Sequence, residues 1–245
     1  MRPIGFSTGA VAYADFRSAL EILAQTNTDA IELSALRADE LHPLVDAIGA
    51  LPLARYRHVS VHLPSHFAPD LENEFCDLIA GLPEEWPLVI HPDVIRNFEQ
   101  WRALGSRVCV ENMDKRKPIG QTRNDLLRIF EVLPEASFCF DIGHAHQIDP
   151  TMCEAIMILR EFRGRLREFH ISEVNSESKH DLISLEAQRS FEIVARLIPD
   201  EIPAIIESRV AASGEFLGDE VRCRIEHEAL LVRKLLRVPV QIAAD

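Results

Sequence analysis

Short runs of apolar and β-branched residues alternate along the chain with longer segments in which apolar residues recur at helical spacing. The eight short runs cover residues 4–7, 30–34, 59–63, 88–91, 108–111, 137–141, 168–172 and 204–207. Their mean spacing of roughly 30 residues is the size of one βα unit. Strands that alternate with helices predict a parallel sheet covered by helices.

Helix signals lie between these runs. Thr122 followed by Asp125 resembles a capping box, and Asp149-Pro150 pairs an N-cap residue with a proline at the first helical position. Residues 184–198 carry apolar side chains at helical spacing. Each of these segments therefore predicts a helix that begins where the signal stands.

The number of units favours a closed barrel over an open doubly wound sheet. Eight units fit into 245 residues, and a (β/α)8 barrel typically takes about 250. The segment from Gly5 to Gly9 lacks the glycine spacing of a dinucleotide-binding fold. No linker rich in Pro, Gly or Ser divides the chain. We therefore expect an α/β fold, a single (β/α)8 TIM-barrel domain over residues 1–245 with closed parallel strands and its active site at the C-terminal face.

Composition limits the partners. Asp and Glu outnumber Lys and Arg by 39 to 26, for a formal net charge of -13, which makes nucleic acid an unlikely partner. Five cysteines form no CxxC pair, which favours a reducing, cytoplasmic setting. No run approaches the ~18 apolar residues of a membrane span, and the N-terminus lacks the apolar stretch of a signal peptide. A small-molecule substrate is expected, and an oligomer is compatible with the sequence.

Side chains that bind metals stand at the ends of six consecutive predicted strands, where TIM barrels carry their active residues. These are His62, His91, Glu111, Asp141, His170 and Glu207, and the strand 30–34 adds Glu32. Because side chains alternate along a strand, Cys109 should lie beneath Glu111 and Cys139 beneath Asp141. Glu168 would lie beneath His170, and such a carboxylate must either pair with an inward Arg or lie below the closed core.

The converging acids indicate a cation. Glu111, Asp141 and Glu207 would repel one another strongly in a low dielectric, and a divalent cation resolves this repulsion. With His170 they form a mixed oxygen and nitrogen donor set that suits Mn, Co, Fe or Zn better than Ca. His62 and His91 are placed to serve a second metal with Glu111 as the bridge. Further donors on the loops are His144, above Asp141, and His180 with Asp181.

Together these segments resemble the xylose isomerase-like TIM-barrel superfamily, which includes sugar and sugar-phosphate isomerases and epimerases and endonuclease IV-type enzymes. The matching pieces are Ile31-Glu32-Leu33, Val61-His62-Leu63-Pro64, Ile90-His91-Pro92, Val110-Glu111-Asn112, Phe140-Asp141-Ile142-Gly143-His144-Ala145, Phe169-His170-Ile171 and Ile206-Glu207. They span the second to the eighth predicted strand. The resemblance thus covers nearly the whole chain.

Resemblance to the ketose 3-epimerase branch implies one metal, held by Glu111, Asp141, His170 and Glu207. The two glutamates would also act as acid and base on a carbon-bound proton, through an enediolate, and His144 would contact the substrate. That branch usually carries an Arg shortly after the strand-seven His, and Ser176 stands about there in this chain.

Resemblance to the endonuclease IV branch implies three zinc ions. Their ligands would be His62 and His91 with Glu111 as the bridge, then Asp141 with His170 and Glu207, and finally His144 with a pair after strand seven. That pair reads Ser178-Lys179-His180, so its usual Asp is missing.

The expected function is therefore divalent-metal-dependent isomerisation or epimerisation of a small sugar or sugar phosphate, and the alternative is a phosphoester hydrolase of endonuclease IV-like type. One to three ions are expected, Zn or Mn first and Co, Fe or Mg as alternatives. Lys115, Arg116 and Lys117 follow the strand 108–111 and either bind a phosphate or form a solvated turn before Pro118. The predicted substrate-binding residues are His144, His180, Lys115, Arg209 and Glu32.

Overall fold

Eight parallel strands close into a barrel in the computed structural model, which describes residues 2–236. The barrel strands are β1 (Ile4–Ser7), β2 (Ala30–Ser34), β3 (His58–His62), β4 (Leu88–Ile90), β5 (Val108–Glu111), β6 (Ser137–Asp141), β7 (Leu166–Ile171) and β10 (Ala204–Ile206). The order around the barrel is β1-β10-β7-β6-β5-β4-β3-β2. The prediction of an α/β TIM barrel with closed parallel strands is confirmed.

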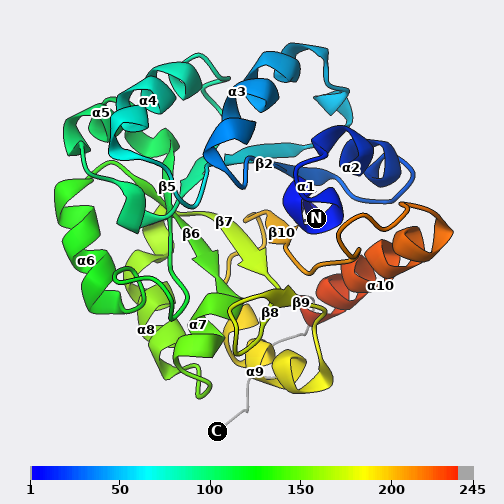
Figure 1. Ribbon diagram of the computed structural model, residues 1–245. Helices are drawn as coiled ribbons and strands as arrows, with labels where there is room; N and C mark the ends of the chain where they lie inside the picture. The colour runs from blue at the N-terminus through cyan, green and yellow to red at the C-terminus, as the bar shows by residue number, and fades with distance from the viewer. Residues whose placement is uncertain (1, 237–245) are drawn as a thin grey trace, which may run out of the picture.

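Helices surround the barrel, and Figure 1 looks at it with the helices arranged as an outer ring. They are α1 (Thr8–Ala12), α2 (Phe16–Leu23), α3 (Ala38–Ala47), α4 (Glu72–Ala80), α5 (Phe98–Ala103), α6 (Arg123–Val132), α7 (Ile142–Ile148), α8 (Cys153–Phe162), α9 (Leu185–Ala195) and α10 (Asp219–Leu235). A small antiparallel hairpin of β8 (Glu173–Val174) and β9 (His180–Asp181) follows β7. Among the described helices, none is both long and apolar enough to cross a membrane.

Most strand ends lie where the sequence places them, within two residues. β1, β2, β5 and β6 match their predictions, whereas β7 begins two residues early, at Leu166. β4 ends at Ile90 and β10 at Ile206, each one residue before the predicted donor. The Glu207 N–H still donates to the carbonyl of Ile171 (3.1 Å), so Glu207 keeps its place at the barrel mouth.

The helix signals hold in two of three cases. Thr122 and Asp125 form the predicted capping box of α6, and Ser184 caps α9. The prediction that a helix begins at Asp149 is wrong, because α8 begins only at Cys153. Asp149 instead closes a turn before it, accepting from the backbone N–H groups of Thr151 (3.0 Å) and Glu154 (2.9 Å).

The alternation of side chains along the strands places two different sets on the two faces. Val89, Cys109 and Cys139 are fully buried and form a small apolar cluster of their own, as expected for the layer beneath the mouth. Neighbouring positions such as Val110 and Phe140 belong to the main core. The single domain over residues 1–245 stays a prediction, since Met1 and residues 237–245 lie outside the described part.

Candidate active site

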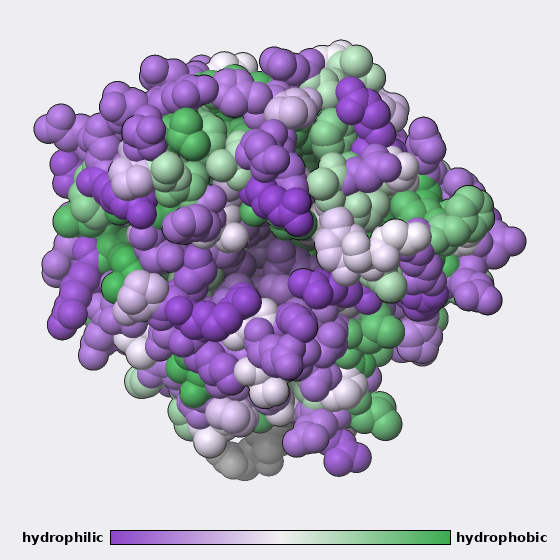
Figure 2. All heavy atoms as spheres, viewed as in Figure 1, coloured by the Kyte–Doolittle hydropathy of each residue, from purple (hydrophilic) through white to green (hydrophobic). Residues whose placement is uncertain are grey.

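A cavity of about 160 Å³ opens at the carboxyl ends of the strands. Figure 2 shows a hollow at the centre of this face, bordered largely by hydrophilic residues. The ionisable side chains that line the cavity are His62, His91, Glu111, Asp114, Arg116, His144, His180, Glu207, Arg209 and Tyr13. Side chains that can bind a metal or transfer a proton are therefore concentrated at the C-terminal face of the barrel.

Four predicted donors converge at one point. Glu111, Asp141, His170 and Glu207 each offer a ligand atom, and these four atoms lie within 4.8 Å of one another. His170 Nδ1 lies 3.0 Å from Glu111 Oε1 and 3.4 Å from Glu207 Oε2. These strand ends come together because β5, β6, β7 and β10 are consecutive neighbours in the barrel.

The quartet fits a divalent cation. Asp141 Oδ1 accepts the backbone N–H of His144 (2.7 Å), but the buried Asp141 Oδ2 and Glu207 Oε2 have no hydrogen-bond partner in the described part of the chain. Buried carboxylate oxygens are normally satisfied, and a divalent cation held by these residues would satisfy both. Three carboxylates and one imidazole form a donor set that suits Mn, Zn and similar metals.

Four further donor groups share residues with this quartet, and two of them include histidines that line the cavity. His62 Nε2 and His91 Nε2 lie 3.4 Å and 3.1 Å from Glu111 Oε2. His62 donates from Nδ1 to the carbonyl of Leu63 (2.8 Å), which leaves its Nε2 free as a ligand. Asp141, His144 and His180 form the other of these two groups.

Asn112 fixes the position of Asp141, and sequence reasoning assigned it no role. Its Nδ2 donates to the Asp141 carbonyl and its Oδ1 accepts the Asp141 N–H, both at 2.8 Å. The Asn112 carbonyl also accepts from His144 Nδ1 (2.9 Å). The only signal in the sequence is an Asn directly after the strand-end Glu111.

The electrostatics of the quartet follow from burial and mutual repulsion. Burial raises the pKa of Asp141 to about 8, and the carboxylates of Glu207 and Glu111 act in the same direction. Burial also acts to raise the pKa of Glu111 and of Glu207, but His170 and other nearby imidazoles outweigh it and hold both values well below normal. Without a cation, the cluster thus balances its negative charge with protons.

The outer imidazoles respond to burial differently. Burial lowers the pKa of His180 to about 4. In His62 burial acts in the same direction, but the carboxylates of Glu32 and Glu111 outweigh it and raise the pKa to about 10. His180 Nδ1 also shares a hydrogen bond with Ser172 Oγ (2.7 Å).

Three of the five predicted substrate contacts line the cavity, namely His144, His180 and Arg209. The Arg209 guanidinium lies 5.7 Å from the centre of the Tyr13 ring. Glu32 does not fit the predicted contact, because it is fully buried and its Oε2 lies 3.1 Å from His170 Nε2, outside the cavity. Glu32 lies two residues before the end of β2, so its side chain lies one layer below the barrel mouth.

The basic loop also differs from the prediction. Lys115 is exposed and does not line the cavity. Arg116 does line it, but its guanidinium is held by Asp114 (3.1 and 3.0 Å). Lys117 pairs with Asp93 at 3.0 Å. Two of the three basic side chains in the loop, Arg116 and Lys117, are therefore already paired with carboxylates.

Glu168 has a partner that the sequence did not indicate. Within residues 2–236 it pairs with no Arg, and its carboxylate lies between His58 and His170. His146, beside α9, packs against Phe191 with ring centres 5.6 Å apart. It does not line the cavity.

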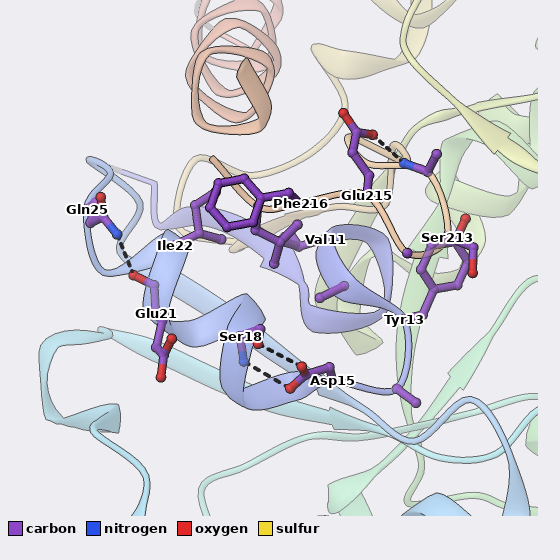
Figure 3. Close-up of a pocket in the computed structure, with 15 residues that line it drawn as sticks. Val11, Tyr13, Asp15, Ser18, Glu21, Ile22, Gln25, Ser213, Glu215 and Phe216 are labelled. Atoms are coloured by element: carbon purple, nitrogen blue, oxygen red, sulfur yellow. Dashed lines mark hydrogen bonds between the residues drawn. The ribbon is translucent and has the colours of Figure 1, made fainter. Parts of the chain in front are cut away.

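A larger cavity of about 570 Å³ lies beside the mouth and shares Tyr13 with it. Figure 3 shows Val11 and Ile22 beneath the Phe216 ring, with Asp15 bonded to Ser18. None of its lining residues is a His or Cys, and no group of possible metal donors among residues 2–236 lies in it. The smaller cavity is therefore the candidate active site.

Comparisons with known proteins bear on the fold. The sequence matches no family model and no curated protein. Solved structures match over nearly the whole chain. L-ribulose 3-epimerase is 14% identical, covering 96% of this chain and 95% of its own, with a TM-score of 0.59. D-allulose 3-epimerase from Methylomonas sp. in complex with D-allulose is 15% identical, covering 95% and 96%, also at 0.59.

A third match is a xylose isomerase domain protein from Alicyclobacillus acidocaldarius. It is 15% identical, covers 96% of this chain and 98% of its own, and has a TM-score of 0.59. These likenesses extend over the barrel from end to end. The chain thus has the fold of the xylose isomerase-like TIM barrels.

Proposed function

We propose that this protein is a divalent-metal-dependent epimerase or isomerase of a small sugar or sugar phosphate. One observation carries the proposal: of the four converging donors, only Glu111 and Glu207 also line the cavity. Asp141 and His170 are fully buried behind them. Two carboxylates that face one cavity are placed to remove and return a proton at a sugar carbon.

Glu111, Asp141, His170 and Glu207 would hold the metal. When bound, a divalent cation would polarise a carbonyl and its adjacent hydroxyl. This would acidify the proton on the carbon that carries that hydroxyl. Zn and Mn suit the donor set, and Co, Fe and Mg are alternatives. His62 and His91 are donors for a second ion.

Glu111 and Glu207 would act as the acid and base pair. One glutamate, as the carboxylate, would take the carbon-bound proton, and the other, in its protonated form, would give its proton to the opposite face, which inverts the carbon. Return to the neighbouring carbon instead gives isomerisation. His144, His180 and Arg209 line the same cavity and would bind the substrate hydroxyls or a phosphate.

The small cavity and the fold both support a small carbohydrate as the substrate. About 160 Å³ is below the roughly 300–1,000 Å³ of drug-sized pockets. Structures of the same fold include epimerases named for L-ribulose and D-allulose. The cysteines are free, which fits a reducing cytoplasmic setting.

The test is proton exchange with solvent. A panel of ketoses and ketose phosphates is incubated with the metal-loaded protein in D₂O, and deuterium at the sugar carbons is followed by NMR. We expect incorporation at one carbon with wild-type protein and a loss of at least about 1,000-fold in Glu207→Gln. Glu228→Gln, a buried glutamate of α10 outside the cavity, serves as the control and should retain exchange. Full exchange in Glu207→Gln contradicts the assignment.

Phosphoester hydrolysis is the second candidate, favoured by the two further donor groups that share Glu111 and Asp141 with the quartet. Metal analysis of the purified protein separates the two. Three zinc ions per chain and cleavage of a phosphodiester, lost in His62→Gln and His180→Gln, would favour hydrolysis. A single ion with deuterium exchange would favour isomerisation.

A further inference from the structure

A polar group lies inside the barrel directly beneath the proposed metal site. His170 is fully buried and faces two ways. Its Nδ1 points to Glu111 Oε1 (3.0 Å) and Glu207 Oε2 (3.4 Å) at the mouth. Its Nε2 lies 3.1 Å from Glu32 Oε2 and 3.1 Å from Glu168 Oε1. Two carboxylates thus converge on one ring nitrogen from the side away from the cavity.

The two carboxylates are held differently. Glu168, on β7, is bonded on its other oxygen to Nε2 of His58, at the start of β3. Among residues 2–236, neither carboxylate oxygen of Glu32, on β2, has a hydrogen-bond partner, so the 3.1 Å approach of its Oε2 to His170 Nε2 is its principal polar contact. Both side chains are fully buried, and neither lines the cavity. They therefore do not touch a substrate.

Burying two carboxylates here is costly, and packing does not require it. A buried charge is stable only when paired, and apolar residues of similar size are often at least as stabilising. The neighbouring interior layer of Val89, Cys109 and Cys139 is of that apolar kind. Glu32 and Glu168 thus call for a role beyond filling space.

The chemistry of metal-binding imidazoles supplies that role. A ligating His generally donates its second N–H to a carboxylate or carbonyl, which fixes the ring and the nitrogen that carries the proton. At His170 the acceptors lie on the Nε2 side and the other donors of the quartet lie on the Nδ1 side. A carboxylate can only accept from Nε2, since both oxygens lack a proton when ionised.

We propose that Glu32 and Glu168 are positioning residues that act through His170: they keep a proton on Nε2 and so aim the Nδ1 lone pair at the site shared with Glu111, Asp141 and Glu207. The inference rests on the proposed function in taking that site to bind a metal. A hydrogen bond with His58 holds the Glu168 carboxylate in place. No such hydrogen bond holds Glu32 among the described residues. We therefore expect the loss of Glu168 to have the larger effect.

Zinc affinity tests the positioning role. The dissociation constant is measured by competition with a chelating dye for wild type, Glu32→Leu, Glu168→Leu and the corresponding Gln variants. We expect affinity to fall about 10–100-fold in each Leu variant. The Gln variants, which keep an acceptor oxygen and nearly the same shape, should recover most of it. Because Gln has nearly the same volume as Glu, the Gln variants can still be measured if a Leu variant does not fold.

Glu72→Gln is the matched control, because Glu72 is a buried glutamate that accepts from Trp101 Nε1 (2.8 Å) on the helix layer. It should lower stability without changing zinc affinity. Leu variants that fold and bind zinc as wild type does would overturn the proposal. So would a Glu72→Gln variant that loses as much affinity as they do.

The position of the proton is read separately in the metal-free protein. With ¹⁵N-labelled histidine, long-range proton–nitrogen NMR should show a hydrogen-bonded proton on His170 Nε2, with a shift that changes in both Gln variants. An Nε2 without a proton would overturn the proposal even if zinc binds. If wild type binds no zinc but this proton is present and responds, the proposed function fails and the positioning of the ring stands.

Discussion

Asp114 shows how a single residue at the cavity wall couples charge to stability. Its side chain is nearly fully buried and accepts from the Arg116 backbone N–H (2.7 Å) as well as from the guanidinium. Burial acts to raise the pKa of Asp114, but the hydrogen bonds from Arg116 outweigh it and lower the pKa to about 2. The ionised form is thus favoured by folding.

Replacing Asp114 by Asn should therefore destabilise the protein in a pH-dependent way. The carboxylate contributes its stability above its unfolded pKa of about 4 and loses it as pH falls toward 2. We expect Asp114→Asn to cost about 2 kcal/mol at pH 7 and almost nothing near pH 2, measured by urea unfolding. Asp219, whose side chain is 89% exposed beside Arg222, gives the control. Asp219→Asn should cost less than about 1 kcal/mol, and an equal effect of the two substitutions would contradict this reasoning.

The donors at the strand ends were predictable residue by residue, and their partners were not. His62, His91, Glu111, Asp141, His170 and Glu207 are found from position alone, because parallel strands bring their carboxyl ends to one edge. The partners of Glu32 and Glu168 depend on the stagger between strands, which alternation does not determine. The prediction that Lys115 contacts the substrate was not supported for another reason. Lys115 lies in a loop, and the loop sequence does not determine where its side chain points.

At the scale of elements, the turn from β6 into α7 depends on one glycine. A Cβ on Gly143 would lie 2.4 Å from the backbone oxygen of Ser172 and 2.7 Å from Val174 Cγ2. It would also approach Asp141 Oδ1 to 3.3 Å. The helix can pack this closely on the segment from Ser172 to Val174 only without a side chain at that position.

Gly143→Ala should therefore disturb both stability and the site. We expect a loss of about 1–3 kcal/mol, typical of overpacking, together with weaker metal binding, because Asp141 must move. Thermal unfolding and zinc titration measure the two effects. Gly164→Ala is the matched control, since a Cβ there meets nothing within 4 Å, and it should stay within about 0.5 kcal/mol. A Gly143→Ala protein that matches this control in both measurements would refute the argument.

Helix beginnings were less predictable than strands. Thr122 and Ser184 cap their helices as expected, because each side chain accepts a backbone N–H three residues on. At Asp149 the same type of side chain closes a turn instead, and Met152 adopts a left-handed conformation (φ 61°) before α8 begins. A capping residue followed by Pro thus fits both a helix start and a turn.

At the scale of the whole molecule, the candidate metal donors come from both halves of the barrel. His62 and His91 follow strands of the first half, and Glu111 to Glu207 belong to the second. A ligand that binds only the folded chain stabilises it by an amount set by concentration and affinity. The barrel as a unit should therefore respond to the metal.

We expect zinc at 100 times its dissociation constant to stabilise the protein by about 2.7 kcal/mol. This corresponds to a rise in Tm of about 5–10 °C for a chain of this size, reversed by EDTA. Differential scanning calorimetry measures it, with Glu207→Gln as the comparison that should respond less. A Tm indifferent to zinc, manganese and cobalt would argue against a metal site.

The buried carboxylates beneath His170 also limit how this barrel can be recombined. In TIM barrels the interior layers are typically filled by bulky apolar side chains. Here Glu32 and His58 come from the first four strands and meet Glu168 and His170 from β7. A chimaera that replaces β1 to β4 would need to retain both residues, or leave the new seam with unmatched charge at its centre. Exchange of the first half of the barrel alone would therefore break the contacts of Glu32 and His58 with His170 and Glu168.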